Sequence, residues 1–587
     1  MTNKEFKLAW SFVNNTDRNV FLTGKAGTGK TTFLHKLKNN SLKRVVIVAP
    51  TGVAAINAKG VTIHSFFQMP FGPILPNQDL NNSSGFNRKF SKTKINIIKS
   101  LDLLIIDEIS MVRADLLDGI DKTLRRFRNK SKVFGGVQVL MIGDLQQLSP
   151  VVKENEWYLL KPFYKNVFFF SSLAYQESNA ITVELKHIYR QDNPKFIDIL
   201  NEIRTNTLTQ SSADELNKRF IPDFTPKDDD GYISLTTHNN RAEQTNNSEL
   251  EKLQTKSKVY KAKVEGKFPE FSYPNKEELE LKVGAQVMFI KNDSSPEKRY
   301  FNGKIGKVIL LDKDEVVVKC PDDEFNIINT TEEWENINYT VNKETNAITE
   351  NRIGSFTQMP LRLAWSITIH KSQGLTFEKA IIDAQAAFAH GQTYVALSRC
   401  KSLEGLVLKS KINSNQIISD SNVISFNKEA EENQPDEQIL QQSKSEFQLN
   451  LISELFDFYK FLYPFNRVLD IYYKNRGSIE GNIETPLNTM KDCITNLLKV
   501  ANGFKTQLNS LIADDKTPEE TPEIQKRFKK AIQYYNTQTE TNIVTPFKTF
   551  GFTTDNKAIE KDLVKQLDSI EELIASKQLY FNKLKNG

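Results

Sequence analysis

The stretch GKAGTGKTT, residues 24–32, comes directly after the apolar run Val20-Phe21-Leu22-Thr23. Its glycines let backbone N–H groups curl around phosphate oxygens, and the residues that follow predict a helix whose positive end points to the same place. The lysine would reach the β- and γ-phosphates, and the hydroxyl of the next threonine would coordinate Mg²⁺. The sequence therefore predicts a nucleoside triphosphate site, with contacts expected from Gly24, Ala26, Gly27, Thr28, Gly29, Lys30, Thr31 and Thr32.

The bulk composition is that of a globular protein and argues against several other classes. The chain has 587 residues, which predicts several domains at one per about 150 residues. It holds 78 basic and 72 acidic residues, so a nucleic-acid partner is permitted but not required. Three widely spaced cysteines, Cys320, Cys400 and Cys493, indicate a reducing compartment without disulfides. The polar amino terminus and the short apolar runs contain no signal peptide or membrane helix, so we expect a cytoplasmic protein with no membrane partner.

A second signal is the run LDLLIIDE, residues 101–108. Its apolar part predicts a buried strand of a parallel sheet, and ligands bind such sheets at the carboxyl ends of the strands. Asp107 is placed to hold Mg²⁺, and Glu108 is placed to orient and deprotonate an attacking water. Two solvated acids at the end of a strand are the alternative, which the phosphate loop upstream disfavours.

A third strand, residues 137–142, leads into GDLQQLSP, residues 143–150. An amide at a strand end beside the γ-phosphate can sense whether that phosphate is present, and we assign this role to Gln147. Alone the segment would be an ordinary strand and turn. In order with the first two signals it predicts the nucleotide sensor of a RecA-like core.

Another strand, residues 44–49, runs into PTGVAA (50–55) and then VTIHSFF (61–67). Hydroxyls, a histidine and aromatic side chains together suit phosphate contacts and base stacking on single strands. A core-facing His64 and Phe66 would be the better interpretation of this stretch in isolation. The predicted DNA contacts here are Thr51, Gly52, His64, Ser65 and Phe66.

Downstream stand SITIHKSQGLTF, residues 366–377, and YVALSR, residues 394–399. Together with the motifs above and IYRQ (188–191), they resemble the Pif-type (petite integration frequency) DNA helicases, RecD-like members of helicase superfamily one, class B. The resemblance covers residues 1 to about 425. It implies an ATP- and Mg²⁺-dependent helicase that moves 5′ to 3′ on single-stranded DNA and unwinds forked or tailed duplex. We expect a monomer, associated with the nucleoid if the source is bacterial.

The resemblance also implies roles for individual residues. Two RecA-like lobes would clamp ATP, and Arg190 and Arg399 would neutralise charge in the transition state. The loop facing the nucleotide would include Gln373 and Gly374, and Thr368, His370 and Lys371 would lie near the single strand. One departure is visible, since the family usually carries an adenine-reading glutamine ahead of the phosphate loop. Lys7 stands at about that place, which leaves the preference for ATP open.

The predicted fold is α/β, with two RecA-like P-loop lobes, a small SH3-like β-barrel insertion and a carboxyl-terminal helical bundle. We expect the insertion as a barrel because strands are predicted at 282–289, 306–311 and 316–318, with a tight Asn302-Gly303 turn. A segment rich in Pro, Gly, Asn and Ser interrupts the first lobe where the family that the chain resembles has a small duplex-splitting wedge, and an ordinary loop is the alternative. The predicted ranges are 1–180 for the first lobe with the wedge at about 68–95, 181–240 and 350–427 for the second lobe, 241–349 for the insertion, 428–445 for a linker and 446–587 for the bundle.

The carboxyl-terminal quarter has helical periodicity, as in Ile559, Leu563, Leu567, Ile570 and Ile574. An aromatic cluster at residues 456–463 could stack bases, but core packing is the more common use. The bundle could dock a protein partner, extend the DNA contact or regulate a motor. A nucleotide-regulated nucleic-acid-binding protein, or a translocase without processive unwinding, is the alternative function. The intact set of Glu108, Arg190 and Arg399 favours turnover instead.

Overall fold

The computed structural model describes residues 3–70, 72–76, 90–189, 193–227, 230–293, 295, 297, 299–321, 323–342, 348–383, 391–413, 419–512 and 516–586. The chain divides into two compact units, Met1–Asn14 with Arg18–Pro435, and Asn15–Asp17 with Asp436–Gly587. Among the described residues, no helix is both long enough and apolar enough to span a membrane.

The first lobe is built on a six-stranded parallel sheet in the order β3-β2-β4-β5-β1-β6. The strands are β1 Val20–Gly24, β2 Val45–Ala49, β3 Val61–Thr62, β4 Leu103–Ile106, β5 Gln138–Ile142 and β6 Ile181–Leu185. Because β6 pairs in parallel with β1 along its whole length, the sheet continues past the boundary predicted at residue 180. A short strand shows nothing in its own sequence about which lobe it joins, and only its pairing with β1 assigns it.

Helices accompany this sheet, and apolar side chains of four of those named next, α4, α5, α6 and α8, form one core with it. The helices are α1 Lys4–Asn15, α2 Lys30–Asn40, α3 Gly52–Asn57, α4 Ile63–Phe67, α5 Lys92–Ser100, α6 Ala114–Phe127, α7 Glu154–Leu160 and α8 Leu173–Ser178. The parallel strands place the segments after β1, β4 and β5 at one edge of the sheet, where such sheets bind ligands.

The second lobe has a four-stranded parallel sheet in the order β18-β7-β19-β20. Its strands are β7 Ile233–Thr236, β18 Ser366–Thr368, β19 Ala380–Ile382 and β20 Leu406–Leu408, and its helices are α9 Pro194–Arg204, α10 Gln210–Asn217, α11 Asn239–Lys252 and α12 Gln392–Ser398. The sheet is assembled from two separated stretches of chain, as the sequence predicts. The two RecA-like lobes of the predicted fold are therefore present.

The insertion between these stretches is all-β. A five-stranded antiparallel sheet has the order β14-β13-β12-β11-β17, and two smaller sheets have the orders β10-β8 and β15-β16-β9. The strands are β8 Ser257–Lys261, β9 Lys263–Gly266, β10 Glu278–Lys282, β11 Gln286–Phe289, β12 Ile305–Leu311, β13 Val316–Lys319, β14 Ile327–Asn329, β15 Glu332–Val341, β16 Ile348–Gln358 and β17 Leu361–Leu363. Since β17 pairs with β11, the insertion ends later than the predicted residue 349. The SH3-like form of this sheet stays a prediction.

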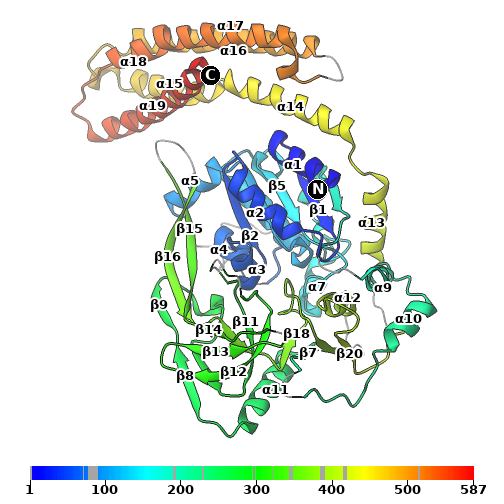
Figure 1. The fold of residues 1–587 in the computed structure, drawn as a ribbon. Coiled ribbons are helices and arrows are strands. Elements are labelled where there is room, and N and C mark those ends of the chain that lie inside the picture. Colours follow the sequence, from blue (N-terminus) through cyan, green and yellow to red (C-terminus); the bar gives the residue numbers. More distant parts are fainter. Residues whose placement is uncertain are drawn as a thin grey trace. The chain divides into compact units, whose positions relative to one another are not determined.

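The hairpin of β15 and β16 joins the insertion to the first lobe, and Figure 1 shows it running past α5. Its Tyr339 is only 2% exposed and packs in the core of the first lobe. The Tyr339 hydroxyl accepts a hydrogen bond from the backbone N–H of Ile47 at 3.4 Å. Tyr339 thus connects the hairpin to strand β2 by a hydrogen bond and by packing in the core of the first lobe.

Two predicted segments need separate comment. Of the predicted wedge, the structure describes 68–70, 72–76 and 90–95, and the remainder lies outside the described residues. The segment predicted as a linker, 428–445, is mostly helical, because α13 Ser421–Glu432 and α14 Glu437–Leu455 occupy it with a break of four residues. The Asp436 side chain caps α14 by accepting the N–H of Ile439, so its polar sequence forms helix rather than coil.

The described part of the second unit is mainly helical. Its helices are α14, α15 Tyr459–Lys474, α16 Glu484–Leu511, α17 Pro522–Thr539, α18 Thr545–Thr549 and α19 Lys557–Asn586. The aromatic cluster divides, since Phe456, Phe458 and Phe461 are buried in the core whereas Tyr459 and Tyr463 are exposed. The phenylalanines therefore pack in the core, as the more common interpretation of the cluster expects.

Candidate active site

The phosphate loop joins β1 to α2, and glycine is required at two of its turns. Gly29 lies ahead of α2 with φ 90°, a left-handed conformation that favours glycine. A Cβ on Gly24 would lie 2.7 Å from the carbonyl oxygen of Leu185. Lys30 Nζ donates to the carbonyl oxygens of Gly24 at 2.6 Å and Lys25 at 3.1 Å. The lysine ammonium thus lies within the loop where phosphates would bind.

Two carboxylates follow β4 at the same edge of the sheet. Glu108 has φ 51° and ψ 45°, an uncommon conformation for a residue with a side chain, so the backbone turns sharply there. Burial raises the pKa of Asp107, the Glu108 carboxylate raises it further, and Lys30 opposes both. Burial also raises the pKa of Glu108 against the attraction of Lys30 and Arg399. Negative charge is therefore concentrated beside the phosphate loop.

Asp144 follows β5 and is the hydrogen-bond acceptor around which the segment GDLQQLSP, residues 143–150, is arranged. Its carboxylate accepts hydrogen bonds from Gln147 Nε2 at 3.0 Å and from the Gln146 N–H at 3.1 Å. Arg204 of α9 pairs with it at 3.3 Å. Burial alone would raise the pKa of Asp144, but Arg204, Lys30 and the Gln147 amide hold it below its ordinary value. The predicted sensor Gln147 is thus fixed by a buried ion pair.

Sequence reasoning missed Arg204. Its side chain is 11% exposed, and it lies between Asp144 at 3.3 Å and Glu184 at 3.6 Å. A basic residue in the last turn of an amphipathic helix ordinarily faces solvent, where it favours the negative end of the helix dipole. No local pattern distinguishes this arginine, and only the packing of α9 brings it to the site.

Helix α12 of the second lobe reaches the nucleotide side of the first lobe, and all seven of its residues are buried. The Tyr394 hydroxyl accepts a hydrogen bond from the N–H of Ala26 in the phosphate loop at 3.1 Å. Ahead of the helix, a Cβ on Gly391 would collide with the carbonyl oxygen of Gln147, so only glycine fits there. The helix thus contacts both the phosphate loop and the third motif.

The second lobe also contributes side chains that face Glu108. Gln373 Nε2 donates to Glu108 Oε2 at 2.8 Å. Arg399, at the end of α12, is 2% exposed, and its Nε donates to the carbonyl oxygen of Val395 at 3.1 Å. The positive charge of Arg399, like that of Lys30, lowers the pKa of Glu108 against the effect of burial. Predicted residues from three separate motifs therefore meet at one point, whereas Arg190 lies outside the described residues.

The residues predicted to contact DNA differ in their exposure to solvent. Ser65 and Lys371 are exposed, and so is Thr51, whose hydroxyl caps α3 by accepting the N–H of Ala54 at 3.2 Å. Burial lowers the pKa of both His64 and His370, which are half-buried.

Two of these predicted contacts are buried in the structure. Phe66 is fully buried against Phe67 and Tyr339, because the face of α4 that carries Phe66 packs into the core of the first lobe. Thr368 is 3% exposed at the end of a parallel strand, where its hydroxyl accepts the N–H of Lys371 at 3.3 Å. Neither side chain is available to a strand of DNA in this arrangement, so the alternative interpretation holds for Phe66.

Known proteins share this arrangement. Residues 3–213 match the PIF1-like helicase family, and residues 439–587 match a domain described as "DNA helicase, middle domain". The ATP-dependent DNA helicase Pif1 of Campylobacter jejuni subsp. jejuni is 32% identical over 436 residues, which cover 70% of this chain and 94% of that protein. This chain belongs to the Pif1 helicase family. The Pif1 of a Psychrobacter species is 34% identical, and the match spans 66% of its length.

A solved Pif1 structure supports the assignment of the fold. Bacteroides sp. Pif1 in complex with ADP-AlF4 is 43% identical, has a TM-score of 0.69 and covers 74% of this chain and 97% of its own. The Pif1-like match therefore extends over about three quarters of this chain, well beyond the residues 3–213 matched by the family model.

Lys7 stands at about the place where the family resemblance leads us to expect an adenine-reading glutamine. Lys7 is exposed on α1, one turn from Trp10. Phe6 and Trp10 are half-buried against Phe33 of α2, and the Lys36 ammonium lies 5.3 Å from the Phe6 ring centre. At this position α1 therefore presents the exposed ammonium group of Lys7.

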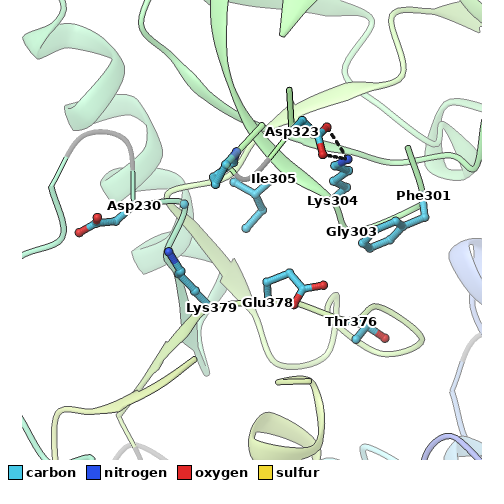
Figure 2. A pocket seen from close by; sticks show the side chains of 11 residues that line it. Asp230, Phe301, Gly303, Lys304, Ile305, Asp323, Thr376, Glu378 and Lys379 are labelled. Atoms are coloured by element: carbon cyan, nitrogen blue, oxygen red, sulfur yellow. Dashed lines mark hydrogen bonds and ion pairs between the residues drawn. The ribbon is translucent and has the colours of Figure 1, made fainter. Parts of the chain in front are cut away.

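A pocket of about 320 Å³ lies between the five-stranded sheet and the second lobe (Figure 2). Its wall includes the ion pair of Lys304 with Asp323, 2.6 Å between Nζ and Oδ2. Gly303 and Thr376 form another part of the wall, where the insertion approaches the chain just after the Gln373 loop. None of its lining residues is a predicted contact of the nucleotide, so this pocket is separate from the Pif1-like active site.

Proposed function

We infer that this chain is an ATP-dependent DNA helicase that moves 5′ to 3′ along single-stranded DNA and unwinds forked or tailed duplex. One observation carries the inference most directly. The Glu108 carboxylate of the first lobe accepts a hydrogen bond from Gln373 of the second lobe, beside the buried Arg399. Hydrolysis chemistry and the contact between lobes therefore share a residue, which is what coupling of ATP turnover to movement requires.

The acidic pair fits a divalent cation. Asp107 and Glu108 lie together in a crowded site, and Lys30 is the cation that lowers the pKa of Asp107. A bound Mg²⁺ would relieve this excess of negative charge and would neutralise charge developing on the phosphates. We propose Asp107 and Thr31 as its protein ligands. Glu108, held in place by Gln373, would orient the attacking water and accept its proton.

The remaining contacts follow from where each residue lies. Backbone N–H groups of residues 24–32 and Lys30 would hold the phosphates, and Gln373 and Gly374 would close the site from the second lobe. Gln147 would sense the γ-phosphate through its bond to Asp144. Arg399 would stabilise charge in the transition state, and Arg190 is proposed for the same role from the family resemblance alone.

For DNA we propose contacts from the exposed or half-buried candidates, namely Thr51, Gly52, His64, Ser65, His370 and Lys371. The Bacteroides relative has been solved bound to ssDNA, and another structure is described as DNA unwinding at forked dsDNA by two coordinating Pif1 helicases. These descriptions support single-stranded and forked DNA as ligands of this chain. We expect this chain to be a monomer in solution.

Strand displacement tests the proposal. Two duplexes of identical sequence, one with a 5′ tail and one with a 3′ tail, are incubated with protein, ATP and Mg²⁺. We expect unwinding of the 5′-tailed duplex only. Unwinding of only the 3′-tailed duplex would keep the helicase but reverse the direction. DNA-stimulated ATP hydrolysis with no unwinding of either would favour the translocase alternative.

A further inference from the structure

The helical unit carries a concentrated positive charge on α17. Four basic residues fall within five consecutive positions of this helix, and all four are exposed: Lys526, Arg527, Lys529 and Lys530. The helix buries a different set of side chains at helical spacing, Ile524, Ile532, Tyr535 and Thr539. The basic side chains therefore lie on the solvent side of an amphipathic helix and take no part in its core.

This arrangement is unfavourable for the fold itself. Lys526 lies three positions from Lys529 and four from Lys530, and Arg527 lies three from Lys530, so like charges repel across the helix surface. Among the described residues, no ion pair relieves Lys526, Lys529 or Lys530. Arg527 donates a hydrogen bond to Gln507 Oε1 of α16 at 2.9 Å, which holds its guanidinium on the α16 side. Within the described residues, no ion pair of these three lysines offsets the repulsion, which points to a negatively charged ligand outside the protein.

An exposed aromatic ring accompanies the charges. Tyr534 lies one turn beyond Lys530 and is 38% exposed. Its neighbour Tyr535 is buried, and the Tyr535 hydroxyl donates to the carbonyl oxygen of Leu497 on α16 at 2.8 Å. The two rings meet nearly edge to face, with centres 5.6 Å apart. An exposed aromatic ring beside several cations is a combination that binds single strands, since phosphates contact the charges and bases stack on the ring.

We propose that this cationic face, Lys526, Arg527, Lys529, Lys530 and Tyr534, is a second DNA site that binds the phosphodiester backbone of a single strand. It adds to the contact made by the two lobes, and it rests on the proposed function only in taking DNA as the ligand. Binding here would be independent of sequence, because phosphates and stacking carry no base code. An acidic protein surface is the competing ligand, and Tyr534 favours the single strand over it.

The test uses the full chain and fluorescence anisotropy with oligo-dT. One variant combines Lys526→Gln, Arg527→Gln, Lys529→Gln and Lys530→Gln, and its matched control combines Lys499→Gln, Lys505→Gln, Lys561→Gln and Lys565→Gln, four exposed lysines of the same unit. For a long oligonucleotide we expect the slope of log affinity against log salt to be shallower by about 3 in the first variant, at about 0.7 per phosphate contact. An oligonucleotide of about 10 nucleotides, the size of one binding site, should bind both variants alike.

A further variant and a folding measurement separate the possible outcomes. Tyr534→Ala should weaken binding of the single strand by about fivefold, with no change of salt slope and no effect on a blunt duplex. Because removing like charges relieves repulsion, the fourfold glutamine variant should melt no lower than the wild type. If that variant and its control have the same salt slope, the inference is wrong and the face is free for an acidic protein. A wild type that binds no DNA would instead contradict the proposed function.

Discussion

The nucleotide cleft and the helical unit use charged side chains in opposite ways. In the cleft, Arg399 and Asp144 are almost fully buried, and protein groups satisfy them at short distances. On α17 the cations are exposed and Lys526, Lys529 and Lys530 have no ion-pair partner in the described chain. Removing the partner of a buried charge is strongly destabilising, and salt screens buried pairs only weakly. Exposed charges interact with ligands through solvent, and salt weakens these interactions. Substitutions in the cleft should therefore block one chemical step, and those on the helical unit should not.

The largest expected effect is that of Arg399→Ala. Removing the guanidinium leaves transition-state charge unbalanced, and related arginine fingers contribute about 10³–10⁵ in rate. We expect DNA-stimulated ATP hydrolysis to fall by at least 10³ at this scale. The same substitution at exposed Arg467 of α15 should leave turnover within about twofold, since an exposed charge of this kind carries little energy. If both variants lost ATP hydrolysis to the same extent, the proposed difference between the nucleotide cleft and the helical unit would be wrong.

The second-largest loss of ATP hydrolysis is expected for Glu108→Gln, which keeps the size of the side chain and removes the proposed general base. A positioned general base contributes about 10²–10⁴, so steady-state hydrolysis should fall by that range while binding of nucleotide and single-stranded DNA persists. Glu572→Gln on α19, an exposed acid of the helical unit, is the matched control and should hydrolyse ATP normally. Robust hydrolysis by the Glu108 variant would refute its assignment as the base.

The same contrast explains which features could be predicted from the sequence. The phosphate loop, the acids after β4 and the split second lobe are encoded locally, because glycines, strand runs and acids stand in a fixed order. Membership of β6 in the first sheet and of β17 in the insertion depends on pairing between distant segments. Arg204 and the buried Phe66 likewise depend on how helices pack. Polar composition at 428–445 indicated a linker, but capped helices formed there instead, since composition alone does not exclude a solvated helix.

The smallest predicted effect tests whether the cleft works as one unit across its two lobes. The Tyr394 hydroxyl accepts the N–H of Ala26 at 3.1 Å, so Tyr394→Phe removes one hydrogen bond between the lobes and leaves the ring in place. A buried bond of this kind contributes about 1 kcal/mol, which corresponds to about a fivefold shift between closed and open arrangements. We expect kcat for DNA-stimulated hydrolysis to fall by up to about fivefold on this account, with nucleotide binding retained. Tyr473→Phe, which removes an exposed bond to Glu484 in the helical unit, should change nothing measurable. A loss near that of Arg399→Ala would mean that the Tyr394 hydroxyl takes part in the chemistry, and no loss would mean that this contact does not help to close the lobes.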